Sequence, residues 1–172
     1  MIESDFLKEN VQLLDSLKKI PTLRPFSNKE LSGLLRMSKL RKYDAGEQII
    51  EEGRIDTWIY FLVQGKVRIV KDGRELAVLK RRGEIFGEMG VIDGSARSAS
   101  VFAVGKSVCL ATDTNRIGQL TDDAKLAFCY VLYRILAEVL AARLRLTNEQ
   151  LLASSGFSFS KLWARLRTSA GF

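Results

Sequence analysis

Residues 58–80, WIYFLVQGKVRIVKDGRELAVLK, are the stretch that decides the fold. They contain three short runs rich in valine, isoleucine and other apolar side chains, of the kind that favour strands. Two turn signals separate the runs, namely Gln64-Gly65 and Asp72-Gly73. Because an Asp-Gly pair suits the positive φ angles of a tight hairpin turn, the stretch predicts consecutive antiparallel strands.

The same pattern of short apolar runs separated by turn residues extends in both directions, from about residue 39 to residue 120. Further strand-like segments are ASVFAV, residues 99–104, and SVCLAT, residues 107–112. Many short strands at this spacing predict a closed or sandwiched antiparallel structure such as a jelly roll. The expected fold class is therefore mainly β with helices (α+β), with an antiparallel β-roll over residues 39–120.

Helices are expected before the roll, in residues 1–38. Apolar side chains recur at helical spacing within residues 3–19, and the prolines at 21 and 25 end that helix. The sequence SNKE then predicts a capping box, in which Ser27 caps the next helix and the Glu30 side chain reaches back to the backbone. A short helix follows, so the roll should be flanked by N-terminal helices.

A long helix is expected after the roll, over residues 121–153. Thr121 can cap it, and the acids Asp122 and Asp123 complement the helix dipole. Apolar residues then recur at alternating steps of four and three, the pattern of a coiled-coil seam. We expect a homodimer through residues 124–150, and the alternative is a helix that only covers the roll of its own chain. The seam consists of Phe128, Leu132, Ile135, Val139, Ala142 and Leu146.

Composition excludes several kinds of site. The 172-residue chain has no histidine, which excludes a His-ligated metal, a His-ligated haem and a Ser-His-Asp triad. Cys109 and Cys129 are too few for a four-cysteine iron–sulfur cluster, and we interpret them as buried thiols in a reducing cytoplasm. No acidic cluster suggests a metal, and no catalytic pair is evident, so we expect no metal and no enzyme activity. No apolar run is long enough to span a bilayer.

The net charge is +7, and residues 154–172 form a short basic tail. Solubility alone explains such a charge. An anionic partner, whether a nucleotide, a nucleic acid or an acidic protein surface, would explain it equally well.

The candidate site is FGEMGVIDGSARSASV, residues 86–101. Its glycines allow a tight turn or a close approach to a ligand. Arg97 brings a planar, permanently charged fork that suits two oxygens of a phosphate. Glu88 would repel a phosphate, but it suits a hydroxyl donor such as a ribose 2′-OH. The combination predicts a nucleotide site, and the alternative is a Glu88–Arg97 salt bridge that closes the loop.

This stretch resembles the phosphate-binding cassette of cyclic nucleotide-binding domains, the family of the bacterial catabolite activator protein and of protein kinase A regulatory subunits. That family has Phe-Gly-Glu, an apolar pair, a short loop and Arg-x-Ala. The matching residues are Phe86-Gly87-Glu88, Val91-Ile92 and Arg97-Ser98-Ala99. The resemblance extends over about residues 20–153. In the family's barrel opening it includes Gly46-Glu47, Glu52-Gly53 and Gly65.

The resemblance implies a role for each matching residue. Glu88 would hold the ribose 2′-OH and Arg97 the cyclic phosphate. Gly87 and Ser98 would add backbone or hydroxyl contacts, with Met89 and Ala99 beside them.

The segment ARLRLTNEQ, residues 142–150, resembles the catabolite activator's dimer helix, where a threonine and the next polar residue meet the adenine. Thr147 and Asn148 stand at those places, and the alternative for them is an ordinary polar helix face.

The function that the resemblance implies is a regulatory sensor. Binding of cAMP would move the cassette and the long helix about a hinge near residues 115–123 and signal to a downstream partner that the sequence does not identify. cGMP is the alternative ligand, because a hydroxyl and an amide near the base suit either purine.

We expect a stand-alone bacterial member without a helix-turn-helix domain, since the 19 residues after Ala153 are too few for a three-helix DNA reader. One alternative is a cAMP-responsive DNA-binding transcription regulator, of which this chain would be a fragment or whose basic tail would bind DNA alone. The other is a family member whose pocket senses another ligand.

Overall fold

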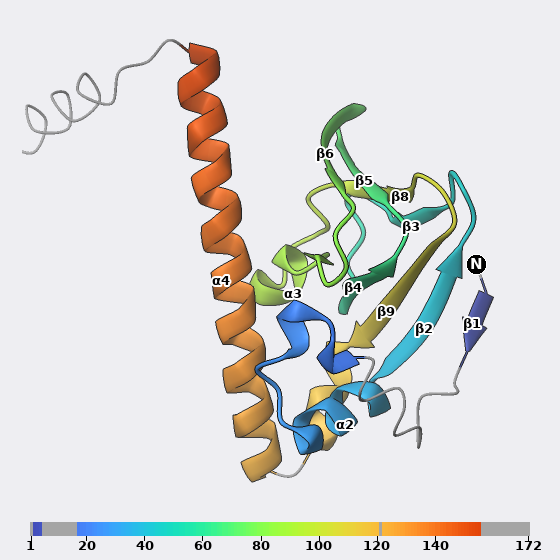
Figure 1. The fold of residues 1–172 in the computed structure, drawn as a ribbon, viewed down its shortest axis with the longest axis vertical. Coiled ribbons are helices and arrows are strands. Elements are labelled where there is room, and N and C mark those ends of the chain that lie inside the picture. The colour runs from blue at the N-terminus through green and yellow to red at the C-terminus, as the bar shows by residue number, and fades with distance from the viewer. Residues whose placement is uncertain (1, 5–16, 121, 156–172) are drawn as a thin grey trace, which may run out of the picture. The chain divides into compact units, whose positions relative to one another are not determined.

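The structure is a computed structural model that describes residues 2–4, 17–120 and 122–155. The chain divides into two compact units, Met1–Tyr133 and Arg134–Phe172. The first unit contains all the described strands, which form two antiparallel sheets (Figure 1).

One sheet has five strands and the other has four. In spatial order, the first sheet consists of β1 (Ile2–Ser4), β2 (Ser38–Tyr43), β9 (Ser107–Asp113), β4 (Trp58–Gln64) and β7 (Ile85–Phe86). In spatial order, the second consists of β3 (Gln48–Ile50), β8 (Ser100–Ala103), β5 (Val67–Lys71) and β6 (Arg74–Leu79). The expected antiparallel β-roll is confirmed.

The core lies between the sheets, because alternate residues of each strand face inward. The rings of Tyr60 and Phe86 stack there with centroids 5.1 Å apart and an angle of 7° between their planes. Strands of both sheets contribute to one buried cluster, so the two sheets share a single apolar interior. The cluster consists of Tyr43, Ile50, Tyr60, Leu62, Val67, Leu79, Phe86, Val101, Ala103, Cys109 and Ala111.

The turns predicted from residues 58–80 are present. β5 and β6 meet at Asp72 and Gly73, whose φ angles are 49° and 74°. Gly65, between β4 and β5, has a φ of 92°, and a Cβ there would lie 2.5 Å from the Lys106 carbonyl oxygen. Only glycine lets these two turns of the roll approach so closely.

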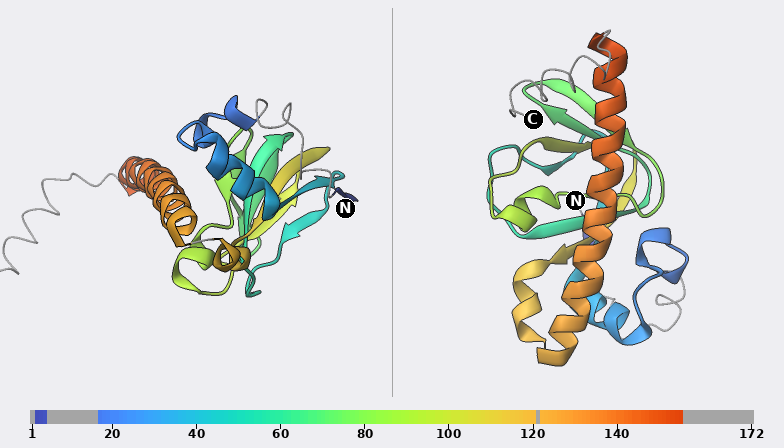
Figure 2. Two further views of the ribbon diagram at one scale, coloured as in Figure 1. Left: turned by 90° about the horizontal axis from the view of Figure 1, so that it is seen from below. Right: turned by 90° about the vertical axis from the view of Figure 1, so that its left-hand side faces the viewer.

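Short helices precede the roll. They are η1 (Pro21–Leu23), a single 3₁₀ turn, and α2 (Asn28–Arg36), and both lie at the end of the sheets where β2 begins (Figures 1 and 2). The capping box of α2 is confirmed: the Ser27 backbone N–H donates to the Glu30 carboxylate at 2.6 Å, and the Glu30 N–H donates to Ser27 Oγ at 3.3 Å. The Thr22 hydroxyl donates to the Gly83 carbonyl at 2.6 Å and ties this segment to the roll.

The helix expected to begin at residue 3 is wrong at its start. Ile2–Ser4 form β1, which pairs with β2 in antiparallel register. The outer edge of β2 presents backbone N–H and C=O groups that a further strand satisfies, and helical spacing in the sequence carries no information about that edge. The rest of the expected helix, up to residue 16, lies outside the described residues.

The helices after β7 are α3 (Met89–Asp93), the 3₁₀ segment η2 (Thr114–Gln119) and α4 (Asp122–Ser155). The long helix is therefore confirmed, although Thr121, its expected cap, lies outside the described residues. Within residues 2–4, 17–120 and 122–155, no helix combines the length and apolar character that a membrane crossing requires.

The predicted seam differs in exposure along α4. Phe128 and Leu132 are buried in the single chain, whereas Ala142 and Leu146 are exposed. Phe128 packs against Phe26 of the segment before α2, with ring centroids 5.6 Å apart. The start of the seam therefore belongs to the core of the first unit, and only its later members are accessible to a partner.

Candidate ligand-binding site

Residues 86–101 link β7 to β8 through α3, and two glycines shape the link. Gly87 has a φ of 77° and Gly94, which ends α3, has a φ of 69°. A Cβ at Gly87 would lie 2.8 Å from Ile50 Cδ1, 3.0 Å from Arg97 Nη1 and 3.2 Å from the Trp58 carbonyl oxygen. The close approach expected for a glycine in this stretch is therefore present at position 87.

Glu88 and Arg97 are both buried, with 2% and 3% of their surfaces exposed. Glu88 directly precedes α3, and its carbonyl accepts the Val91 and Ile92 backbone N–H groups at 3.1 and 3.0 Å. Charged residues are seldom buried without partners, because desolvation of a charge is costly. The structure thus encloses the acid and the base that the sequence singled out.

Arg97 binds a carboxylate that lies outside the cassette. Its Nε donates to Asp56 Oδ2 at 3.1 Å, and its Nη2 donates to Asp56 Oδ1 and, at 2.5 Å, to the Trp58 carbonyl. Its Nη1 donates to the Gly87 carbonyl. The sequence pattern predicted a phosphate at this fork and gave no sign of Asp56, which lies 41 residues earlier and belongs to no recognisable motif.

The pairing limits how an anion can reach Arg97. A guanidinium has five N–H groups, and four hydrogen bonds to Asp56, Trp58 and Gly87 engage four of them. One Nη1 hydrogen remains for a ligand, and an anion that replaced the Gly87 carbonyl would gain a second. Arg97 could therefore bind a phosphate while Asp56 still holds the other edge of the fork.

Backbone hydrogen bonds join the cassette to the loop that carries Asp56. The Arg97 N–H donates to the Arg54 carbonyl at 2.7 Å, and the Gly53 N–H donates to the Arg97 carbonyl at 2.8 Å. The Glu52 N–H donates to Ser100 Oγ at 3.0 Å. The position of Arg97 is thus coupled to the β3–β4 loop through its backbone as well as its side chain.

The pKa of Asp56 reflects this arrangement. Burial by itself raises the pKa of the carboxyl, but hydrogen bonds from Arg97 and the Trp58 N–H, with the charges of Arg97 and Arg54, hold the pKa below its ordinary value. When the pKa of a carboxyl is lower in the folded state than its unfolded-state value of about 3.9, the ionised group stabilises the fold at pH values above about 3.9. This stabilisation is lost as the pH falls through the folded-state pKa.

We therefore expect wild-type protein to lose more free energy of unfolding than Asp56→Asn between about pH 5 and about pH 2. Urea unfolding followed by circular dichroism at both pH values measures the difference. Asp44→Asn is the matched control and should follow the wild type, since the Asp44 carboxylate makes no hydrogen bond or ion pair within the described residues. Equal losses in wild type and Asp56→Asn would contradict the assignment.

Two of the expected contact residues lie at the surface. Met89 and Ser98 are exposed, and Ser98 Oγ lies 3.8 Å from Met89 Sδ. The Ser98 carbonyl accepts a hydrogen bond from Lys71 Nζ at 3.0 Å, so the β5–β6 hairpin reaches the cassette. Ala99 is half-buried. The cassette thus combines a buried charged pair with an accessible polar and apolar rim.

A second arginine lies beside Trp58. The Arg41 guanidinium is stacked over the Trp58 ring, 4.1 Å from its centroid, and donates to the Tyr60 hydroxyl at 3.1 Å. Trp58 therefore contacts Arg41 with its ring and Arg97 with its carbonyl. No sequence signal distinguishes Arg41, since a lone arginine is usually a solvated surface residue.

Thr147 and Asn148 lie in the part of α4 that belongs to the second unit, and both side chains are exposed. Their expected contact with a nucleotide base stays a prediction. Within the part of the chain that the structure describes, no three His, Cys, Asp or Glu residues form a group that could hold a metal ion.

Comparison with known families identifies the family to which the roll and its cassette belong. Residues 40–123 match the family model described as the cyclic nucleotide-binding domain. These residues form a cyclic nucleotide-binding domain. The match contains the whole cassette together with Asp56, and it confirms the family that the residues of the cassette had indicated.

Relatives of the cyclic nucleotide-binding domain occur in kinases and in a bacterial activator. The chain is 33% identical over 116 residues to the cAMP-dependent protein kinase type II regulatory subunit of Drosophila melanogaster, over 64% of this chain and 30% of that protein. It is 28% identical over 114 residues to human cGMP-dependent protein kinase 2, over 63% of this chain and 15% of that protein. The Thermus thermophilus catabolite activator protein is 31% identical with a TM-score of 0.62, over 78% of this chain and 63% of that chain.

Proposed function

We propose that this chain is a regulatory sensor that binds cAMP in its cyclic nucleotide-binding domain. The observation that carries the proposal is the burial of both Glu88 and Arg97 in the cassette that follows Gly87, within the matched residues 40–123. A buried arginine and a buried carboxylate in one cassette of this fold suit a ligand that has both a phosphate and a free hydroxyl.

Each residue has a distinct part in the proposed complex. Arg97 neutralises the cyclic phosphate with the N–H groups that Asp56 leaves available. Glu88 accepts the ribose 2′-OH, and its burial strengthens that hydrogen bond because the local dielectric is low. Met89, Ser98 and Ala99 line the rim of the same site. Gly87 lets the backbone approach Arg97, since any side chain there would meet the guanidinium.

The base is the least determined part of the ligand. Thr147 and Asn148 are the proposed contacts, and a hydroxyl with an amide can pair with adenine N6–H₂ or with guanine O6. Relatives named for each nucleotide match this chain with similar identity. We favour cAMP because the segment around Thr147 resembles the catabolite activator's helix, and thermal-shift measurements with cAMP and cGMP compare the two directly.

The 2′-OH assignment gives the sharpest test of the proposed function. Wild-type protein should bind cAMP more tightly than 2′-deoxy-cAMP, and Glu88→Gln should lose most of that preference, because a neutral amide accepts a hydroxyl more weakly than a carboxylate does. Isothermal titration calorimetry with both ligands on both proteins measures the ratio. A Glu88→Gln variant that keeps the wild-type preference would contradict the role of Glu88, and absence of cAMP binding to wild type would contradict the function.

We further propose that the chain forms a homodimer through α4 and that this helix transmits ligand binding to a partner protein. Among the exposed apolar side chains of the later half of α4 are Leu144 and Leu146, with 62% and 59% of their surfaces exposed. Exposed leucines on a long helix are typical of a helix–helix interface. The downstream partner is then a protein that distinguishes two arrangements of this helix. To shift the chain from one arrangement to the other, cAMP must bind one of them more tightly.

Leu146→Lys should therefore produce monomers, because a charge replaces an apolar side chain in the seam. Light scattering at several protein concentrations measures the mass. Ala137→Lys, at an exposed position of α4 outside the seam, is the control and should remain dimeric. Wild-type protein that is monomeric, or a Leu146→Lys variant that is still dimeric, would reject the seam. Leu132 is buried in the single chain, so a charge at that position would disturb the fold as well as the seam.

A further inference from the structure

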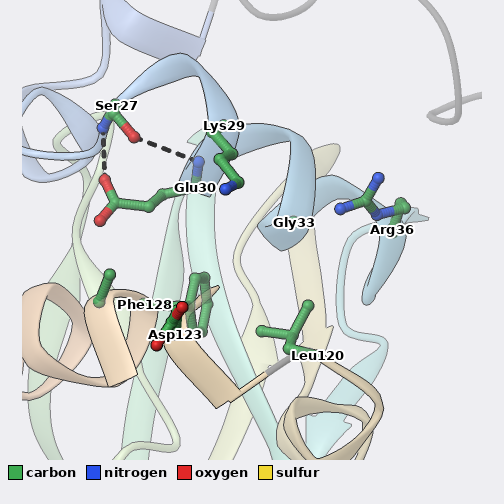
Figure 3. Close-up of a pocket in the computed structure, with 9 residues that line it drawn as sticks. Ser27, Lys29, Glu30, Gly33, Arg36, Leu120, Asp123 and Phe128 are labelled. Atoms are coloured by element: carbon green, nitrogen blue, oxygen red, sulfur yellow. Dashed lines mark hydrogen bonds between the residues drawn. The ribbon is translucent and has the colours of Figure 1, made fainter. Parts of the chain in front are cut away.

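A cavity lies away from the cassette, between α2 and the start of α4. It has a volume of about 170 Å³ and is lined by Ser27, Lys29, Glu30, Gly33, Arg36, Leu120, Asp123, Ala127 and Phe128. All of these residues belong to the first unit, and none lies in residues 86–101. Figure 3 shows Lys29 and Arg36 from α2 and Asp123 from α4 around one hollow.

Gly33 is the residue that keeps the hollow open on the side of α2. It lies inside a nine-residue helix, where glycine is among the least favourable residues. Sterically the fold does not require it, since a Cβ at Gly33 would make a single ordinary contact, 4.0 Å from Leu120 Cδ2. Because Gly33 has no side chain, it leaves beside α2 a space that a larger residue would occupy.

The charges around the cavity are not neutralised by one another. Lys29 and Arg36 lie two turns apart on one face of α2, and Asp123 lies opposite them on α4. No ion pair within the described residues involves any of these three side chains. Glu30 differs, since its carboxylate already accepts the Ser27 N–H at 2.6 Å. The rim therefore carries Lys29 and Arg36 on the α2 side, together with the hydrogen-bonded Glu30 carboxylate, and the Asp123 carboxylate on the α4 side.

The floor of the cavity is apolar. Phe128 is buried, with 1% of its surface exposed, and Ala127 and Leu120 lie beside it. A cavity of about 150 Å³ with such a lining is large enough for a benzene ring. The floor thus has room for one apolar side chain of a ligand, while the polar part of that ligand remains at the rim.

We infer that this cavity binds a small zwitterion with an apolar side chain, an α-amino acid in its chemistry. The carboxylate of the ligand lies against Lys29 and Arg36, the ammonium group lies against Asp123, and the side chain enters the space over Phe128 beside Gly33. The inference does not depend on the proposed nucleotide site, because neither the residues nor the ligand chemistry are shared.

The test is a titration of the full chain with L-phenylalanine, followed by ¹⁵N–¹H NMR. The backbone signals of Gly33 and Ala127 should shift and saturate, with a Kd of about 0.1–5 mM, as expected for a ligand of this size. Phenylacetate lacks the ammonium group and phenethylamine lacks the carboxylate, so each should bind at least tenfold more weakly. Absence of these shifts up to about 20 mM, or equal binding of all three probes, would overturn the inference.

Variants locate the binding within the cavity. Gly33→Leu fills the hollow and should abolish binding of L-phenylalanine, whereas Gly105→Leu is the matched control, since a Cβ at Gly105 meets nothing within 4 Å. Arg36→Gln and Asp123→Asn alter exposed side chains without filling space, and each should weaken binding at least fivefold. Unchanged affinity in a folded Gly33→Leu, or in both charge variants, would place the ligand elsewhere and reject the site.

Discussion

Arg97→Ala should weaken cAMP binding by well over tenfold, a loss on the order of 2–5 kcal/mol for a buried charge pair. The reason is that the cyclic phosphate would be left in an enclosed site without its charged partner. Arg97→Lys should recover only part of the affinity, because an ammonium group cannot keep the two-pronged contact with Asp56 and also reach the phosphate. Isothermal titration calorimetry measures all three affinities.

Arg81→Ala is the control for this experiment. Arg81 is exposed and its side chain has no ion pair within the described residues, so its removal changes the net charge equally without touching the cassette. Because Arg97 also holds Asp56, circular dichroism should confirm that Arg97→Ala is folded before its affinity is compared. A folded Arg97→Ala that binds cAMP like the wild type would remove the basis of the proposed function.

Gly87→Ala should destabilise the protein by about 2–4 kcal/mol and reduce cAMP affinity at least tenfold, because strain and steric overlap add at one position. The backbone φ of 77° is unfavourable for any residue with a Cβ, and that Cβ would lie within 3.2 Å of Ile50, Arg97 and Trp58 atoms. Arg97 Nη1, the group that we expect to meet the phosphate, is one of those atoms. Urea unfolding and calorimetry measure the two effects.

Gly94→Ala separates the two causes. Its φ of 69° is equally left-handed, but a Cβ at Gly94 meets nothing within 4 Å. It should therefore cost only the backbone strain, about 1–2 kcal/mol, and leave cAMP affinity close to the wild type. If Gly87→Ala and Gly94→Ala had the same effect on both measurements, the close approach at Gly87 would have no role in the site.

Much of the roll could be predicted because its signals are local. The turn at Asp72-Gly73 depends on residues that are neighbours in the chain, and the same is true of the α2 capping box formed by Ser27 and Glu30. The glycines around Glu88 and the arginine at 97 were recognisable because the cassette is one continuous stretch. Backbone propensity and short-range hydrogen bonds act within a few residues, and this is the range that a sequence pattern can report.

The position of β1 was not predictable, because the free edge of β2 that it pairs with exists only after folding. The division of the α4 seam is similar: identical spacing runs through Phe128 and Leu146, yet Phe128 is buried against Phe26 whereas Leu146 is exposed. Periodicity marks which face of a helix is apolar, but what covers that face depends on packing with distant segments.

By itself the sequence determined the strand and turn pattern, the capping box of α2 and the residue types of the cassette, since those follow from neighbouring residues. Tertiary structure alone decided that Asp56 holds Arg97 across 41 residues and that Gly33 faces an open cavity beside Phe128. Such pairings depend on how the β3–β4 loop and the ends of separate helices meet in space. The physical reason is that burial and desolvation act between surfaces, and those surfaces are assembled from segments that are far apart in the chain.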